Sequence, residues 1–304
     1  MTSLPSIGAR DALFIIDLLT FVRRAYHSVA PLSSPSDEPT QATYLTMKLL
    51  DRLIAERDPK LLAVAIDSKG PSVRKSIDPN YKANRTAPPD DFGVLVERVR
   101  SLIELCGIQV WHVEGFEADD VIATAVRLAL DADLRVVIAS SDKDMMQLVG
   151  PRVVLWDSMR NKVYGTDEVI AKFGVRPDQV GDLLALWGDS SDNIKGVPAV
   201  GQKKASELLN LFGSMEEIYR SLDQIKGRIG DNLRIHQHAA HIAKRLVTLR
   251  TDLPIPFDVI TLERRHHHNE SWLRDAFDEL GFTQSPMRIS APHARNDETQ
   301  QQIW

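Results

Sequence analysis

The sequence predicts an α/β protein with a second, all-helical domain. Short apolar runs alternate with helical patterns over residues 1–173, which is the order of βαβ units around a parallel sheet. After Gly174 only helical patterns remain, so a helical domain is expected over residues 174–288. Residues 289–304 are polar and are predicted to be a tail.

The strands are predicted from apolar runs that are continuous rather than alternating, as in parallel strands buried on both faces. These runs are Leu13–Ile16, Leu61–Ile66, Ile108–Val113, Leu134–Ala139 and Val153–Trp156. Helical periodicity between the runs predicts helices over Thr40–Arg57, Asp91–Cys106, Ala118–Leu130 and Lys143–Leu148. In the second domain it predicts helices over Pro177–Trp187, Gln202–Leu211, Met215–Ser221, Gly230–Leu249 and Glu270–Leu280.

The composition excludes several classes of protein. A single cysteine, Cys106, cannot form a disulfide framework. No apolar run reaches the roughly 18 residues of a membrane-spanning helix, and the N-terminus lacks the pattern of a signal peptide, so a cytoplasmic location is expected. The net charge of −5 favours neither a nucleic acid nor a membrane as partner.

Acidic side chains follow the predicted strands or begin the helices after them. Because the carboxyl ends of parallel strands face one edge of a sheet, these side chains are expected to converge there, with two more from the helical domain closing the site. They are Asp17, Asp67, Glu117, Asp119, Asp120, Asp142 and Asp144, followed by Asp189 and Asp192. For any one aspartate alone, a helix cap or a solvated loop is the simpler interpretation.

Such a cluster has a chemical consequence. Carboxylates without compensation repel one another, so a group of them beside buried strands indicates bound divalent cations. Ligands that are all oxygen select Mg²⁺ or Mn²⁺ rather than zinc. Two ions roughly 3.5–4 Å apart would suit the hydrolysis of a phosphodiester bond.

Basic residues gather in two places. The segment 68–90 has no strand or convincing helical pattern, and it carries Arg74, Lys82 and Arg85 around Tyr81. Cations beside an aromatic ring suit a nucleic-acid strand, whose phosphates they contact while the ring stacks on a base. A solvated basic loop is the alternative, but the segment follows Asp67 directly. Arg23 and Arg24 follow Asp17 and extend this surface.

The second basic place is a glycine-rich turn in the helical domain. Gly196 and Gly201 bracket a tight turn, and a predicted helix carrying Lys203 and Lys204 begins at once. Backbone N–H groups at such a helix start can hold a phosphate, so this turn is expected to bind duplex without reading its sequence. An ordinary packing corner between two helices is the alternative.

Taken together, the motifs resemble the 5′→3′ exonuclease and flap endonuclease family, which includes the N-terminal nuclease domain of bacterial DNA polymerase I and its stand-alone relatives. The resemblance extends over about residues 10–285. The residues that carry it are Phe-Ile-Ile-Asp17, Ala-Ile-Asp67, Asn-Tyr-Lys82-Ala-Asn-Arg85, Gly-Phe-Glu117-Ala-Asp-Asp120, Ser-Asp142-Lys-Asp144, Gly-Asp189-Ser-Ser-Asp192-Asn and Gly196-Val-Pro-Ala-Val-Gly201.

The resemblance implies a PIN-like core, a helix–three-turn–helix domain for duplex binding, and an arch or clamp over residues 68–100. A first metal is implied among Asp17, Asp67, Glu117, Asp119 and Asp120, and a second among Asp142, Asp144, Asp189 and Asp192. Lys82 and Arg85 would stabilise the scissile phosphate and Asp120 would be essential, so that Asp120→Asn would fold normally but not cleave. Tyr81 would stack near the cleaved nucleotide and Arg74 would place the strand. K⁺ could bind the main chain of Leu186, Trp187, Lys195, Val197 and Val200.

The implied function is structure-selective, Mg²⁺-dependent cleavage at 5′ ends and 5′ flaps of DNA, with RNA primers as further substrates and a monomer as the simplest state. A non-catalytic binder of branched DNA and a PIN-type ribonuclease are the two alternatives. The sequence ends at Trp304 without a polymerase domain, so a free-standing nuclease or a piece of a longer one is expected.

Overall fold

The computed structural model describes residues 12–27, 33–35, 38–89, 91–264, 270–282 and 284–287. The tail predicted for residues 289–304 lies outside these ranges. Within the described ranges, no helix combines the length and the apolar character needed to cross a membrane.

The core is one mixed sheet with the strand order β3-β2-β1-β4-β5-β6. The first five strands in the chain run parallel, and β6 pairs antiparallel with β5. All five predicted strands are present, and β6 completes the sheet. Their bounds are β1 (Ala12–Asp17), β2 (Leu61–Ala65), β3 (Gln109–Trp111), β4 (Arg135–Ala139), β5 (Val153–Asp157) and β6 (Lys162–Tyr164).

Strand β1 shows why the predicted runs are continuously apolar. Leu13 and Ile15 point into one buried cluster, whereas Phe14 and Ile16 point into another on the opposite face of the sheet. Side chains alternate along a strand, so a strand covered on both faces needs apolar residues at every position. Each such side chain contributes roughly 1.5–3 kcal/mol when it is fully buried.

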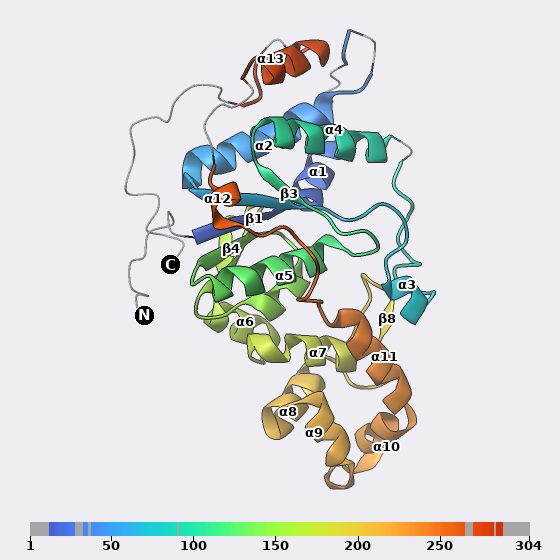
Figure 1. Ribbon diagram of the computed structural model, residues 1–304. Helices are drawn as coiled ribbons and strands as arrows, with labels where there is room; N and C mark the ends of the chain where they lie inside the picture. Colours follow the sequence, from blue (N-terminus) through green and yellow to red (C-terminus); the bar gives the residue numbers. More distant parts are fainter. Residues whose placement is uncertain are drawn as a thin grey trace.

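Helices cover both faces of the sheet (Figure 1). One cluster includes residues of α1 (Leu18–Tyr26), α2 (Gln41–Arg57), α4 (Phe92–Leu105) and α13 (Glu270–Glu279). The other includes α5 (Ala118–Asp131), the 3₁₀ helix η2 (Lys143–Leu148), α6 (Thr166–Phe173) and α12 (Val259–Leu262). The predicted helix at 143–148 is therefore present, but with the tighter 3₁₀ winding common in short pieces.

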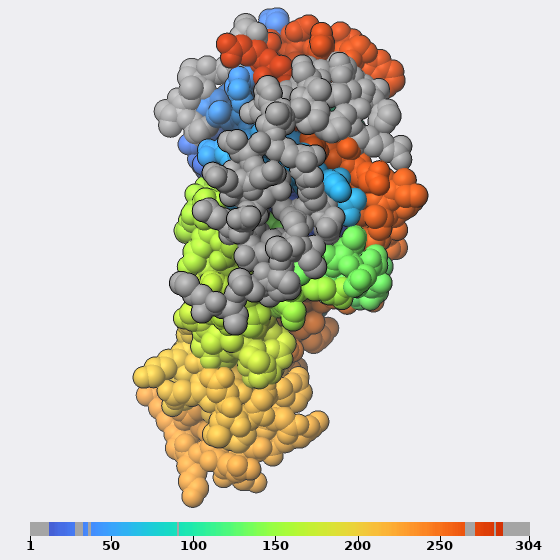
Figure 2. All heavy atoms as spheres, turned by 90° about the vertical axis from the view of Figure 1, so that its left-hand side faces the viewer, coloured from blue at the N-terminus to red at the C-terminus, as the bar shows by residue number. Residues whose placement is uncertain are grey.

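The helical domain forms a lobe below the sheet, drawn yellow to orange in Figure 2. Its core is continuous with the cluster on the α5 face of the sheet. The predicted helix over 230–249 is two helices, because the backbone leaves the helical region at His236. The elements are η3 (Pro177–Gln179), α7 (Val180–Trp187), β7 (Gly188–Asp189), β8 (Ile194–Lys195), α8 (Gln202–Phe212), α9 (Met215–Arg220), η4 (Leu222–Gln224), α10 (Gly227–Ile235) and α11 (Gln237–Val247).

After α11 the chain returns to the sheet instead of staying in the helical domain. The Trp111 indole donates a hydrogen bond to the Pro256 carbonyl at 2.9 Å, and the Arg264 backbone N–H donates to the Lys60 carbonyl at 2.8 Å. Helix α13 then packs with α4 on the face of the sheet opposite to α5. The predicted helical domain over 174–288 thus extends too far, because its last part belongs to the core.

Residues 66–89, called the crossing segment below, follow β2 and cross over one end of the sheet. The segment contains the short helix α3 (Arg74–Ile77) and a series of turns up to residue 85. Val99 and Ile103 of α4, which follows, are fully buried in the cluster on the α4 face of the sheet. The predicted arch over 68–100 is therefore too long, since its last part is a core helix.

Candidate active site

The candidate site lies where the chain leaves the sheet in two directions. From β1 the chain continues to β2 on one side, whereas the neighbouring β4 continues to β5 on the other. A crevice forms at such a switch point, outside the carboxyl ends of the strands. Here it is a pocket of about 790 Å³.

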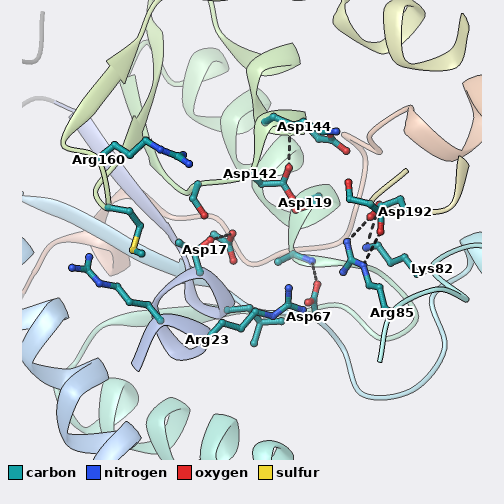
Figure 3. A pocket seen from close by; sticks show the side chains of 18 of the residues that line it. Asp17, Arg23, Asp67, Lys82, Arg85, Asp119, Asp142, Asp144, Arg160 and Asp192 are labelled. Atoms are coloured by element: carbon teal, nitrogen blue, oxygen red, sulfur yellow. Dashed lines mark hydrogen bonds and ion pairs between the residues drawn. The ribbon is translucent and has the colours of Figure 1, made fainter. Parts of the chain in front are cut away.

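Six of the predicted acidic residues line this pocket, and Figure 3 shows their side chains around one space. They come from the ends of β1, β2 and β4, from the first turns of α5 and η2, and from the loop after β7. The six are Asp17, Asp67, Asp119, Asp142, Asp144 and Asp192. The convergence expected from strand order is therefore present for these residues.

Local hydrogen bonds fix three of these carboxylates. Asp17 accepts hydrogen bonds from the hydroxyls of Thr20 and Ser140, both at 2.7 Å. Asp67 accepts from the backbone N–H of Ala118 at 2.6 Å and so binds the first turn of α5, whose dipole favours negative charge. Asp142 caps η2 by accepting from the Asp144 N–H.

The electrostatics of the pocket favour positive ligands. Burial, followed by repulsion from neighbouring carboxylates, raises the pKa values of Asp119 and Asp144, the latter to about 8. Burial likewise raises the pKa values of Asp67 and Asp142. Oδ1 of Asp144 and Oδ2 of Asp189 are buried and find no hydrogen-bond partner among the described residues. Buried oxygens without partners beside crowded acids fit a hard cation.

The side chains as placed do not form a finished metal cage. Among the described residues, no three His, Cys, Asp or Glu side chains are grouped closely enough to hold an ion. Cations bind four of the predicted ligands instead, namely Glu117, Asp120, Asp189 and Asp192. Glu117 accepts from Lys82 at 2.9 Å, and Asp192 accepts from Arg85.

The raised pKa of Asp144 gives a testable stability effect. The protonated Asp144 carboxyl contributes fully to the free energy of unfolding below the pKa of an unfolded aspartate, about 3.9. This contribution is lost as the pH rises through the folded-state pKa of about 8. In EDTA at pH 8, Asp144→Asn is therefore expected to raise Tm by a few degrees, on the order of 1 kcal/mol, and to have less effect at pH 5. Thermal unfolding at both pH values measures this. A lower Tm for the variant at pH 8 would contradict it.

Cations flank the acidic cluster on two sides (Figure 3). Lys82 and Arg85 lie on one side, next to Asp192, and Arg23 and Arg160 lie on the other. Arg24 and Lys172 also line the pocket, and Arg23 and Arg24 are exposed on α1 as the sequence suggested. A cluster of carboxylates with cations on two sides can bind metal ions and the phosphate backbone of a nucleic acid at the same time.

Tyr81 is not placed for the predicted stacking. Its side chain is buried, and its hydroxyl donates to Glu117 at 2.9 Å and to Asp192 at 3.0 Å. The prediction for Tyr81 is therefore corrected. The hydroxyl of Tyr81 fixes the crossing segment at the edge of the pocket. The side chain of the neighbouring Lys82 lines the pocket and contacts Glu117.

Arg74 and Asp120 form a buried ion pair instead of contacting DNA and metal. Two guanidinium nitrogens of Arg74 donate to the two carboxylate oxygens of Asp120 at 2.5 and 2.8 Å. Arg74 also donates to the carbonyls of Leu246 and Thr248, and the Arg250 N–H donates to Asp120. Asp120 is fully buried and does not line the pocket. Both predicted roles are corrected, because the pair joins the crossing segment, α5 and the end of α11.

Comparison with known proteins decides the family. A family model described as "5'-3' exonuclease, N-terminal resolvase-like domain" matches residues 12–174, and one described as "5'-3' exonuclease, C-terminal SAM fold" matches residues 175–270. The chain belongs to the 5′-3′ exonuclease family. The α/β core with a helical second domain predicted from the sequence is confirmed by this match.

This 5′-3′ exonuclease family member matches both long DNA polymerase I proteins and a shorter 5'-3' exonuclease. It is 37% identical over 265 residues to DNA polymerase I of Rhizobium leguminosarum, covering 83% of this chain and 26% of the relative. The chain thus spans about a quarter to a third of the DNA polymerase I relatives that it matches. It is 35% identical to a 5'-3' exonuclease of Aquifex aeolicus, covering 80% of this chain and 83% of the relative.

Solved structures share the fold. A bacteriophage T5 5'-exonuclease with bound divalent metal ions (zinc) has a TM-score of 0.64 at 24% identity, covering 79% of this chain and 90% of its own. The T5 flap endonuclease in a complex with DNA and metal ions has a TM-score of 0.64 at 22% identity, covering 89% and 93%.

Sequence reasoning missed three pocket cations of this exonuclease family member. Arg160 follows the end of β5 and donates to the buried Asp157 at 2.8 Å. Its position after the end of β5 is the signal in the sequence, since β5 neighbours β4 and runs parallel to it. The helical pattern over 143–148 gives Lys143 no role in the site, yet its ammonium donates to Asp189 at 2.8 Å. Lys172 comes from α6 and carried no signal in the sequence.

The glycine-rich turn is built from the hairpin β7–β8 followed by α8. Gly201 is the N-cap of α8 and makes no side-chain cap, so the first N–H groups of the helix stay available for a phosphate. Lys203 is exposed, whereas Lys204 pairs with Glu207. The residues whose main chain is predicted to bind K⁺ lie in and around this hairpin. There the Leu186 carbonyl accepts a hydrogen bond from the Val197 N–H at 2.7 Å.

Gly196 permits the closest backbone approach in this hairpin. A Cβ there would lie 2.2 Å from the Trp187 carbonyl carbon and 2.4 Å from the Gly188 nitrogen. Gly196→Ala is expected to cost about 2 to 3 kcal/mol through overpacking and to weaken duplex binding on the order of tenfold. Gly150→Ala, outside the turn, is the control, because a Cβ there meets nothing within 4 Å. Unfolding and duplex titration test this, and equal behaviour of the two variants would refute it.

Proposed function

We propose that this chain is a Mg²⁺-dependent nuclease that cleaves phosphodiester bonds at 5′ ends and 5′ flaps of DNA. The observation that carries the proposal is a single pocket with six aspartates between two basic walls. The family names and the T5 complex with DNA and metal ions support it.

The proposed metal-binding residues are the six pocket aspartates, with Glu117 and Asp189 at the margins. All offer oxygen, which favours Mg²⁺ or Mn²⁺. The orphaned oxygens of Asp144 and Asp189 support a site at that end of the pocket. When bound, two such ions would supply a nucleophilic water at neutral pH and offset the charge that develops on the leaving oxygen.

Lys82 and Arg85 are proposed to hold the oxygens of the scissile phosphate. Burial alone would lower the pKa of Lys82, but Glu117 and Asp192 outweigh burial and raise it, so the side chain stays cationic. In the structure, Lys82 donates to Glu117 and Arg85 donates to Asp192. When substrate and metal ions bind, the phosphate would replace these carboxylates as the partner of both cations, and the carboxylates would bind the metal ions. Arg23, Arg24 and Arg160 are proposed to contact neighbouring phosphates from the opposite wall.

The helical domain is proposed to bind the duplex beside the flap. The start of α8 with Lys203 would contact the backbone, and K⁺ bound by the main chain of the β7–β8 hairpin is part of this proposal. RNA primers as further substrates, a monomeric state and action at a bacterial nucleoid are also proposed.

Cleavage of a panel of labelled substrates tests this function. With Mg²⁺ the chain is expected to cut 5′-flap DNA near the junction, and EDTA should abolish the cut. Binding of the flap without cleavage under any divalent ion would favour the non-catalytic alternative. Faster cleavage of single-stranded RNA than of flap DNA would favour the ribonuclease alternative.

A further inference from the structure

A second hollow, of about 480 Å³, lies beside the pocket of the proposed active site. Lys143 lines both hollows. Between them the crossing segment is tied to the loop after β7. The Lys82 N–H donates to the Asp192 carbonyl at 2.9 Å, and the Asn84 amide donates to the Ser190 carbonyl at 2.7 Å. A nucleotide next to a phosphate in the first pocket is therefore within reach of the second.

Trp187 is the aromatic residue of this second hollow. It ends α7 between the buried Leu186 and the buried Gly188, yet it is 37% exposed. The Lys143 ammonium lies 6.0 Å from the centroid of its ring, at the outer limit of a cation–π contact. The indole thus presents apolar surface in a hollow whose other lining is mostly polar, which suits stacking against a nucleobase.

The polar lining offers what the rest of a nucleotide would need. Asn84, Ser190 and Asn193 carry amide and hydroxyl groups that can meet a base edge or a sugar. Lys195 is exposed and forms no ion pair with any carboxylate in the described part of the chain. A cation without a partner at the rim of the hollow is available for a phosphate.

We propose that this hollow is a nucleotide-binding subsite, in which Trp187 stacks on an unpaired base next to the scissile phosphate. Lys195 and Lys143 contact the phosphates on either side of that base. A base within a duplex cannot reach such a ring, so the subsite favours a strand that is already unpaired, such as a flap. The inference rests on the function proposed above and names a specificity-determining residue for it.

The subsite is tested by binding in EDTA, where no cleavage occurs. Flap DNAs are compared that each carry one abasic nucleotide at a successive position near the junction, with Kd from fluorescence anisotropy. For the unsubstituted chain, one abasic position is expected to weaken binding on the order of tenfold. Trp187→Leu should weaken binding of the intact flap by the same factor and should no longer respond to that abasic position.

Trp272→Leu is the matched control, because Trp272 is 63% exposed on α13, packed on the other face of the sheet. It should bind every flap normally. The inference is overturned if Trp187→Leu binds the intact flap as tightly as the unsubstituted chain. It is also overturned if the variant binds all flaps more weakly but keeps the positional effect, since that is a structural defect. If the unsubstituted chain neither binds nor cuts flap DNA, the proposed function itself fails.

Discussion

Asp120→Asn is expected to destabilise the protein by about 3 kcal/mol, with a fall in Tm on the order of 10 °C. The substitution leaves the buried guanidinium of Arg74 without its anion, and removing one partner of a buried pair costs about 3–5 kcal/mol. The low end applies because asparagine keeps an oxygen for the Arg250 N–H. Thermal or urea unfolding measures the effect, which is the opposite of the normal folding expected from the sequence.

Two further variants separate this effect from other causes. Asp131→Asn removes an exposed ion pair with Arg127 on the same helix and should cost less than about 1 kcal/mol. Arg74→Met combined with Asp120→Leu removes both charges and should recover part of the stability. Mn²⁺ titration of the folded Asp120→Asn protein should give unchanged affinity. Unchanged Tm together with lost metal binding would return Asp120 to the metal site.

Asp142→Asn is expected to lower kcat for flap cleavage by about 10³-fold. Asp142 lies between β4 and η2, where it faces both Asp17 and Asp144, so it is placed to serve both proposed metal ions. Asparagine keeps the hydrogen bond to the Asp144 N–H, so folding should be retained. Single-turnover cleavage with Mg²⁺ is the measurement.

Stability and a surface control make this result specific. Because the pKa of Asp142 is raised by burial first, removing its charge should not lower Tm in EDTA. Asp131→Asn should cleave normally. Cleavage by Asp142→Asn within about tenfold of the unsubstituted rate would remove Asp142 from the catalytic set.

The sheet and the acidic pocket could be predicted because both follow from patterns along the chain. Apolar runs at every position indicate strands covered on two faces, and the ends of β1, β2 and β4 then bring Asp17, Asp67 and Asp142 to one edge. Partners distant in sequence could not be predicted in this way. Asp120 looks like a pocket acid beside Asp119, but one position along a helix turns it toward Arg74 and the end of α11.

Tyr81 shows the same limit. Its place among cations suggested a ring for stacking, and nothing local indicates that Glu117 and Asp192 accept its hydroxyl hydrogen bond. Trp187 is the converse case. An apolar residue at a helix end looks like core, and only the packing of the hairpin leaves it exposed.

The return of the chain from α11 to the sheet has a mechanical consequence. The helical lobe is joined to the core by two covalent crossings, one before η3 and one after α11, and the Arg74–Asp120 pair lies at the second. Two covalent connections together with the buried ion pair restrict rotation of the lobe relative to the sheet more than a single connection would. Under the function proposed above, the protein framework sets the distance between a duplex bound by the lobe and the pocket, and this distance would determine where the strand is cut.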